Sequence, residues 1–434
     1  MLNRVCVSRL GGVAVALSLL AGGSVSLGQA TFQLLPTLNP GNVGGGAGLS
    51  VSPDGSTVVG YTDSPIGSQA FRWRQGEGMI GLGIPTDWFG EDYTSFSSAA
   101  YACSENGDFI VGVVTENENG NLKGFKWTSA TGIEDVSVPD FLGCRDVSTD
   151  GSVIVGEDYS TGAFINGYYL TGDGIMQTGS PNTQRLVWGC SADGTVLAGS
   201  QGAFPSEGFI YTDLTGPVGV GDIPGGAANS GFNAISLDGT VAAGFGSDSD
   251  VQGRQFQAVR WDATSGIEGI GRLPGRNLSS AFAVNGDGGV IVGNSFNSGD
   301  SRSQKGFIWT TGAGILDLEQ VLLDQGATGF GGFHIIACEA ISRDGLTVAG
   351  IAMDNNFNQK AFVAHLSSIP GTNACDPDVN QDGNVDQGDI DYLINVVAGG
   401  NNPTNIDPDF DHDGNADQGD IDALINVVAG GDCP

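Results

Sequence analysis

The stretch Ser52-Pro53-Asp54-Gly55-Ser56-Thr57-Val58-Val59-Gly60 decides the fold, because close copies of it return six more times along the chain. Each copy has Ser-x-Asp-Gly or a near variant, and a second glycine follows five residues after the first. The copies begin at Ser52, Ser104, Ser148, Ser191, Ser236, Asn285 and Ser342, and their second glycines are Gly60, Gly112, Gly156, Gly199, Gly244, Gly293 and Gly350. Such regularity indicates a repeat architecture.

Each copy predicts a hairpin. Asp-Gly or Asn-Gly favours the positive φ angles of a tight turn between two strands. The serine two residues earlier can hydrogen-bond local backbone amides and hold the turn closed. Aromatic-x-Trp, as in Phe71-Arg72-Trp73, predicts a third strand with large inward side chains, and the Gly-Met or Gly-Ile element, as in Gly78-Met79, predicts a fourth.

Four strands in each unit of about 43 to 57 residues match the size of a propeller blade. We therefore predict an all-β, seven-bladed β-propeller over residues 31–366. The seventh unit has Ala361-Phe362-Val363-Ala364 as its third strand and lacks a fourth strand before Ser367. Residues 31–38 resemble that fourth strand, so we expect them to complete blade seven and cover its edge. This fragment argues against the alternative architecture, an open β-solenoid.

The repeats resemble the extracellular HAF-repeat family, which is named for a His-Ala-Phe-like third strand. Here Gln69-Ala70-Phe71 and Lys360-Ala361-Phe362 lack the histidine. The resemblance implies an exported, propeller-like domain with no established reaction. Ser-x-Asp-Gly is also similar to the Asp-box hairpin of sialidases, although the tryptophan that closes that box is missing.

Two matching twelve-residue loops follow, at residues 378–389 and 409–420. Both carry oxygen donors at positions 1, 3, 5, 9 and 12, glycine at position 6, and a backbone carbonyl at position 7, which is the pattern of a calcium loop. The predicted ligands of two calcium ions are Asp378, Asn380, Asp382, Asn384, Asp386 and Asp389, and Asp409, Asp411, Asp413, Asn415, Asp417 and Asp420. The alternative is an acidic turn region that binds no metal. Two consecutive full matches to the calcium-loop pattern argue against it.

Each loop runs into a helix-like segment, 386–400 and 417–431, with apolar residues at helical spacing. We assign Ile390, Leu393, Ile394 and Val397, with Ile421, Leu424, Ile425 and Val428, to the apolar faces. The arrangement resembles a dockerin of the GC type, type I-like, in which aspartate at position 12 is usual. The resemblance implies a small all-α, EF-hand-like module over residues 375–434, joined by a linker at 367–374, that binds a cohesin-like partner. Its contact positions would be Gln387, Gly388, Gln418 and Gly419. Cys375 and Cys433 bracket the module, and we predict that they form a disulfide.

The N-terminus is typical of a secretory signal peptide. Arg4 and Arg9 precede an apolar run at residues 11–21, and small residues continue to Ala30. The run is too short to span a membrane. We therefore expect residues 1–30 to be removed and the protein to be secreted or displayed at the cell surface. Cys103, Cys144, Cys190 and Cys338 lie in predicted strands, where buried free thiols are favoured over disulfides.

The formal net charge of −33 argues against nucleic acid and anionic membrane as partners. We hypothesise a non-catalytic binding or scaffold protein whose dockerin anchors it in a calcium-dependent way, with a glycan or cell-surface ligand at the propeller. No catalytic residue is assigned. The alternative is a polysaccharide-degrading enzyme, a glycosyl hydrolase or lyase, anchored by the same module. It would need a placed pair of carboxylates, and the sequence singles out none.

Overall fold

The computed structural model describes most of the chain. The described residues are 29–41, 45–89, 95–118, 120–136, 143–158, 166–172, 174–178, 184–202, 205–248, 256–371, 377–380, 382, 384–403, 406, 408, 410 and 416–429. The predicted signal segment up to residue 28 lies outside these ranges, as do both cysteines of the predicted disulfide, Cys375 and Cys433.

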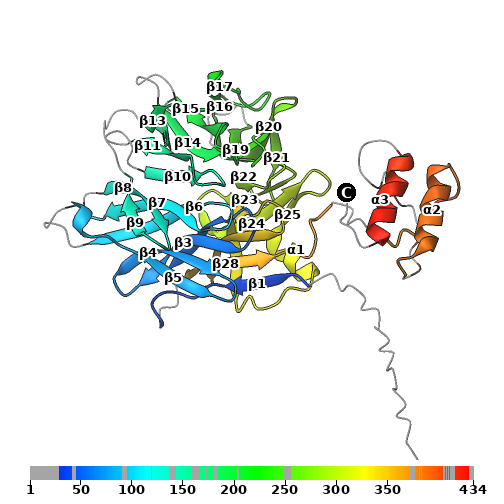
Figure 1. Ribbon diagram of the computed structural model, residues 1–434, viewed down its shortest axis with the longest axis horizontal. Helices are drawn as coiled ribbons and strands as arrows, with labels where there is room; N and C mark the ends of the chain where they lie inside the picture. The colour runs from blue at the N-terminus through cyan, green and yellow to red at the C-terminus, as the bar shows by residue number, and fades with distance from the viewer. Residues whose placement is uncertain are drawn as a thin grey trace, which may run out of the picture.

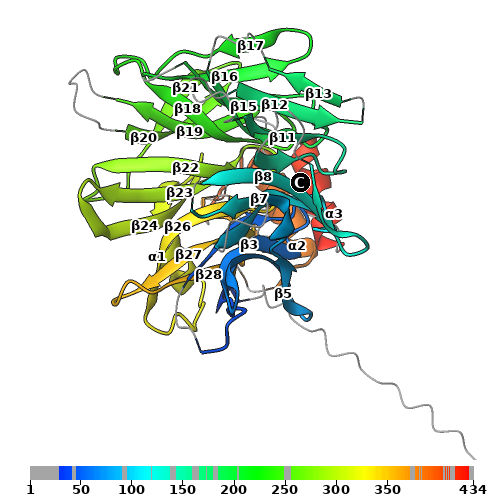
Figure 2. The same cartoon turned by 90° about the vertical axis from the view of Figure 1, so that its left-hand side faces the viewer.

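Seven antiparallel four-stranded sheets form the main body, so the seven-bladed β-propeller is confirmed (Figures 1 and 2). The innermost strands are β2 (Gly46–Val51), β6 (Phe96–Cys103), β10 (Gly143–Val147), β14 (Arg185–Cys190), β18 (Ser230–Ile235), β22 (Leu278–Val284) and β26 (Phe333–Ile341). The second strands are β3 (Thr57–Ser64), β7 (Phe109–Glu116), β11 (Ile154–Asp158), β15 (Leu197–Gln201), β19 (Val241–Ser247), β23 (Val290–Asn297) and β27 (Thr347–Asp354).

The third and outer strands complete the blades. The third strands are β4 (Gly67–Arg74), β8 (Asn121–Thr128), β12 (Asn166–Thr171), β16 (Glu207–Thr212), β20 (Phe256–Asp262), β24 (Asp300–Thr310) and β28 (Gln359–His365). The outer strands are β5 (Gly78–Gly83), β9 (Gly132–Asp135), β13 (Gly174–Gln177), β17 (Gly216–Gly219), β21 (Gly266–Gly271), β25 (Gly314–Asp317) and, for the seventh blade, β1 (Thr31–Leu34).

The repeated turn joins the innermost strand to the second strand in every blade. In the first blade, the Ser52 hydroxyl donates to Asp54 at 2.6 Å and accepts from the amide of Thr57 at 3.0 Å. The amide of Gly55 donates to the carbonyl of Ser52 at 2.8 Å, and Gly55 has a φ of +74°. The predicted role of the serine is thus confirmed. The prediction of positive φ at both residues is wrong for Asp54, because only the glycine is left-handed.

These turns also bond to one another around the ring, through the residue that follows the serine. The amide of Glu105 donates to Thr149 at 2.8 Å, and the amide of Thr149 donates to Ala192 at 2.9 Å. The ring closes where the amide of Arg343, in the last blade, donates to the carbonyl of Pro53 in the first at 2.9 Å. One band of backbone hydrogen bonds therefore links neighbouring blades.

The second glycine of each repeat lies opposite a β-bulge in the innermost strand. In the second blade, Gly112 pairs with Ala100, and the register shifts across Tyr101. A Cβ at Gly112 would lie 2.0 Å from the carbonyl oxygen of Ala99 and 2.8 Å from the Phe125 ring of the third strand. Glycine is required here because the bulged strand and the aromatic residue already occupy that space.

Large aromatic side chains fill the spaces between blades, as the aromatic-x-Trp element predicts. Phe71, Phe125, Phe209, Phe307 and Phe362 of the third strands are completely buried. Because the same position repeats from blade to blade, each sheet packs against the next through a small core of its own.

The N-terminal strand closes the ring, as expected. β1 pairs antiparallel with β28, with Phe32 opposite Ala364, so residues from the two ends of the propeller share one blade (Figure 1). Phe32 is buried and stacks on Phe330 and Phe362, with ring centroids 4.1 and 5.4 Å apart. This strand joins the first and last parts of the domain by hydrogen bonds and by packing.

Helices occur outside the blade pattern. A short 3-10 helix covers Asp87–Phe89. The helix α1 (Leu318–Asp324), which the sequence did not predict, packs through Leu318 and Leu322 against the sixth and seventh blades. Near the C-terminus, α2 (Gln387–Val397) and α3 (Gln418–Val428) pack together and form the C-terminal helix pair. Within the described residues, no helix is long and apolar enough to cross a membrane.

Closure by β1 predicts that Phe32→Ala lowers the free energy of unfolding of the propeller by about 3 kcal/mol, since a buried, doubly stacked ring is lost. Denaturant unfolding followed by tryptophan fluorescence measures this, because all six tryptophans lie between Trp73 and Trp309. Leu214→Ala is the control, because Leu214 is almost fully exposed. Equal stability of the two variants would show that β1 contributes little to closure.

Candidate functional site

The first predicted calcium loop is held by its own side-chain oxygens. The amide of Asp382 donates to Asp378 Oδ1 at 3.0 Å and to Asn380 Oδ1 at 2.9 Å. The amide of Asn384 donates to Asp382 Oδ1 at 2.9 Å. The predicted ligands at positions 1, 3 and 5 therefore lie side by side around one stretch of backbone.

The aspartate at position 12 is the buried member of each loop. Asp389 and Asp420 are completely buried at the start of α2 and α3. Asp389 accepts from the amides of Asn380 at 3.2 Å and Asp386 at 2.9 Å, and thus ties the start of the loop to its end. Asp420 accepts from the amide of Asp417 in the same way.

Basic residues are missing from this part of the sequence. Residues 367–434 contain fourteen aspartates and neither lysine nor arginine. Burying carboxylates without a nearby cation is costly, so bound divalent metal would supply a counter-charge that the segment lacks. Oxygen donors alone are the set that calcium prefers.

The described residues do not test the predicted calcium sites in full. Over the described ranges, no group of three or more His, Cys, Asp or Glu side chains is gathered to hold a metal. In the second loop, Asp417 and Asp420 are described, whereas Asp409, Asp411, Asp413 and Asn415 lie outside the described residues. Calcium binding therefore stays a prediction.

The predicted partner residues lie at the start of each helix of the pair. Gln387 and Gln418 are exposed, and Gly388 and Gly419 are half-buried. Assigning Ile394 and Ile425 to the buried faces is wrong, because each is 44% exposed. The helix pair buries Ile390, Leu393 and Val396 from α2 and Ile421 and Leu424 from α3, so the isoleucines fall on the outer side of the helix pair.

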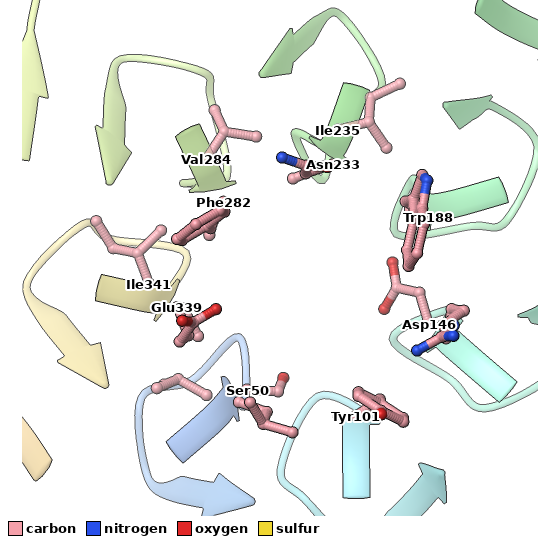
Figure 3. Close-up of a pocket in the computed structure, with 17 residues that line it drawn as sticks. Ser50, Tyr101, Asp146, Trp188, Asn233, Ile235, Phe282, Val284, Glu339 and Ile341 are labelled. Carbon is pink, nitrogen blue, oxygen red and sulfur yellow. The ribbon is translucent and has the colours of Figure 1, made fainter. Parts of the chain in front are cut away.

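A second candidate site lies in the channel of the propeller, where sequence analysis assigned no residue. The bulge of each innermost strand turns one side chain into a cavity of about 330 Å³, which we call the channel cup (Figure 3). The seven bulge residues, in blade order, are Leu49, Tyr101, Arg145, Trp188, Asn233, Phe282 and Glu339.

Apolar side chains form the floor of the channel cup. They lie two residues after a bulge residue and are buried: Val51, Ile235, Val284 and Ile341. The residues at the same position in blades two to four, Cys103, Val147 and Cys190, are also buried and line a second cavity. This smaller cavity, of about 90 Å³, lies beyond the floor, toward the turns. The channel cup is therefore a lined recess with an apolar base.

The four cysteines of the propeller are free thiols, as favoured from the sequence. Cys103, Cys144, Cys190 and Cys338 are all buried and unbridged. Burial raises the pKa of Cys103 and of Cys144 to about 12, so these thiols remain protonated and serve as packing groups.

One side of the channel cup holds a cation of the chain itself. The Arg145 guanidinium lies between two aromatic rings, 4.8 Å from the centroid of Tyr101 and 4.9 Å from that of Trp188. It also forms an ion pair with the buried carboxylate of Glu157. Blades two to four thus present aromatic, guanidinium and aromatic groups in sequence.

Asp146 lines the same side but is bound to the backbone. Its carboxylate accepts from the amides of Cys190, at 2.9 Å, and Val147, at 2.8 Å. Burial raises the pKa of Asp146 to about 6, and the hydrogen bonds from Cys190 and Val147 oppose that rise. Asp146 therefore links the third blade to the fourth.

The opposite side carries Asn233, Phe282 and Glu339 from three consecutive blades (Figure 3). The Asn233 amide nitrogen donates to the carbonyl of Ala281 at 2.8 Å, which fixes the side chain. Among described residues, the Glu339 carboxyl has no hydrogen-bond or ion-pair partner, and burial raises its pKa to about 7. This side therefore offers a carboxyl group that its surroundings leave available.

No protein-family model matches the chain, and no curated protein does. The HAF-repeat and dockerin resemblances therefore stay predictions.

The structure is similar to three solved propellers. They are TolB from Acinetobacter baumannii (11% identity, TM-score 0.40, 72% of this chain and 64% of that chain), putative TolB from Agrobacterium tumefaciens (13%, 0.41, 72% and 98%) and the β-propeller domain of the trilobed protease from Pyrococcus furiosus, with an open velcro topology (10%, 0.48, 79% and 99%). The chain thus spans just under two thirds of the Acinetobacter TolB. The assignment of seven blades rests on the strand pairing within this chain.

A signal for the channel cup does exist in the sequence. Every bulge residue stands three positions before the Ser or Asn of its turn and eleven before the second glycine, as Tyr101 does before Ser104 and Gly112. At this position the seven repeats carry seven different residues. The turns and glycines align without showing which position faces the axis, so the spacing alone does not identify these residues as a site.

Glu339 should make the stability of the propeller depend on pH. Its folded pKa, about 7, exceeds the ordinary value of 4.5, so the folded protein holds this proton more tightly than the unfolded chain. Stability attributable to Glu339 is therefore present below about pH 4.5 and is lost as pH rises through 7, by up to about 3 kcal/mol. Glu339→Gln should stabilise the protein relative to wild type more at pH 8 than at pH 5.

Urea unfolding followed by tryptophan fluorescence at the two pH values measures the difference. The exposed outer-strand variant Glu268→Gln serves as the control. If Glu339→Gln changes stability equally at pH 5 and pH 8, the carboxyl is not perturbed as described.

Proposed function

We propose that this is an exported binding protein whose C-terminal helix pair is a dockerin-like, calcium-dependent anchor for a cohesin-like domain. The propeller is the part displayed. The observation that carries the proposal is the pair of buried position-12 carboxylates, Asp389 and Asp420, in a segment with fourteen aspartates and no lysine or arginine. Two calcium ions, each held by one loop, would neutralise that charge and fix the helix starts.

The outer surfaces of the two helices support a partner-binding role. Gln387, Asp391 and Ile394 follow one another on one exposed stripe of α2, and the Gln387 amide donates to Asp391 at 3.1 Å. Gln418, Asp422 and Ile425 repeat this arrangement on α3, with the amide of Gln418 donating to Asp422 at 3.0 Å. An exposed isoleucine at the same place on both helices fits an apolar contact with a partner.

The alternative function is a polysaccharide-degrading enzyme. One observation favours it: two carboxyl groups, Asp146 and Glu339, line the same cavity. Both oxygens of Asp146 already accept backbone hydrogen bonds, which suits a structural link better than acid–base or nucleophilic chemistry. We therefore favour the binding function.

Removal of calcium should unfold the helix pair and spare the propeller. Because the aspartates repel one another without metal and the core of the pair is small, we expect chelator to reduce the helical circular dichroism signal. Tryptophan fluorescence should not change, because residues 367–434 contain no tryptophan. A helical signal that excess chelator leaves intact would overturn the proposal.

A matched pair of variants locates the ion. Asp389→Asn should weaken calcium binding at least tenfold, since a buried position-12 carboxylate is lost. Asp391→Asn changes the same residue type two positions later, on the exposed side, and should bind calcium as the wild type does.

The likeness of the two helices predicts two interchangeable binding orientations. Gln387→Ala with Ile394→Ala should leave affinity for a cohesin domain from the same cell near the wild-type value, as should Gln418→Ala with Ile425→Ala. All four changes together should abolish binding. Gly388 is best left unchanged, since a Cβ there would lie 2.9 Å from Asp386 and disturb the loop. Loss of binding in one double variant alone would exclude the symmetric mode.

A further inference from the structure

We infer that the channel cup binds a small organic cation, a guanidinium or alkylammonium group on a short apolar stem, between Phe282 and Glu339. This inference concerns the propeller alone and does not rest on the calcium-dependent anchor. It begins from the fact that the residue at the bulge position differs from one repeat to the next. The seven blades share their turns and glycines, and all but the fifth have an aromatic core residue in the third strand, yet the bulge residues have seven different identities.

Charge gives the first argument. Among the described residues that line the channel cup, Arg145 is the one basic side chain, and the buried carboxylate of Glu157 already neutralises it. Asp146 and Glu339 remain, so the lining has an excess of negative charge, in a chain whose formal net charge is −33. A recess of this sign attracts cations and repels anions.

The second argument is an internal precedent. Blades two to four hold the guanidinium of Arg145 between the rings of Tyr101 and Trp188. Blades five to seven present comparable groups: an aromatic face at Phe282, the carboxyl of Glu339 beside it, and the Asn233 side chain on the other side. In Figure 3, Phe282 and Glu339 lie across the cavity from Asp146 and Trp188. A cation above an aromatic ring and next to a carboxylate is stabilised by both.

The volume and the apolar base of the channel cup limit the size and the uncharged part of the ligand. A cavity of about 330 Å³ is at the small end of ligand sites, enough for one side-chain-sized group. Ile235, Val284 and Ile341 supply an apolar base on which a short hydrocarbon stem can pack. Glu339 has no partner among the described residues, so a bound cation would provide its counter-charge.

The test is calorimetric titration of the full chain at pH 8, low ionic strength and saturating calcium, with n-butylguanidinium as the probe. We expect saturable binding at one site per chain, and no binding of the uncharged isostere n-butylurea or of glucose. Glu339→Gln should weaken affinity at least tenfold and Phe282→Leu at least threefold, while the surface control Glu268→Gln should bind as the wild type does. Tryptophan fluorescence establishes that each variant is folded.

A second arm distinguishes a free small-molecule cation from the side chain of a partner protein. Acetyl-Gly-Arg-Gly-amide carries the same guanidinium on a peptide, and binding comparable to that of n-butylguanidinium would identify an arginine side chain as the ligand. Binding of n-butylguanidinium alone would identify a free small molecule. The inference is overturned if neither cation binds, if n-butylurea binds equally well, or if both Glu339→Gln and Phe282→Leu retain full affinity.

Discussion

The ring of backbone hydrogen bonds between the repeated turns is the constraint on which the rest of the structure depends. The residue after the serine of a turn, or after Asn285, offers its carbonyl to the preceding turn and in most blades its amide to the following one. In the fifth blade the amide comes from the next residue, Asp238. Pro53 has no amide, so the first blade uses the amide of Asp54 to reach Glu105 instead, at 3.2 Å. The bond from Arg343 to Pro53 closes the circle. Since these donors and acceptors are on the backbone, the side chain at this position is free to vary, as Thr149 and Leu237 show.

Much of the fold could be predicted from the sequence because the interactions that specify it are local. Ser-x-Asp-Gly carries its own hydrogen bonds, and the number of copies gives the number of blades. The closing strand could be found because blade seven lacked an outer strand. The helix α1 could not be found in this way, since it occurs once and its buried Leu318 and Leu322 have no repeat to reveal them. Ile394 was misplaced because two helices that pack as a pair bury a narrower face than helical spacing alone suggests.

The two candidate sites also differ in whether a local sequence motif marks them. The predicted calcium ligands follow from spacing alone, because one short loop would supply a whole ligand set. The channel cup collects one residue from each of seven blades, so no local motif marks it. The bulge and the second glycine nevertheless depend on each other. The glycine leaves room for the carbonyl of the bulged strand, and the bulge turns a side chain such as Trp188 toward the axis. The fold thereby keeps one axis-facing position per blade open to specialisation.

The acidic side chains of the protein are of two kinds. Some carboxylates are stabilised by hydrogen bonds or positive charges of the protein itself, and others lack a positive charge nearby. Hydrogen bonds from Ser152 and Ser148 lower the pKa of Asp150, and the turn aspartates are stabilised as anions by their own neighbourhood. Asp389 accepts two amide bonds at a helix start, yet its segment contains no basic residue. Among the described residues, Glu339 has neither a hydrogen-bond donor nor a basic partner, and burial raises its pKa. The first kind of carboxylate builds the fold without any partner. The other two gain most from a positive charge brought from outside. In our two proposals this charge is a divalent metal at the predicted calcium loops and an organic cation beside Glu339.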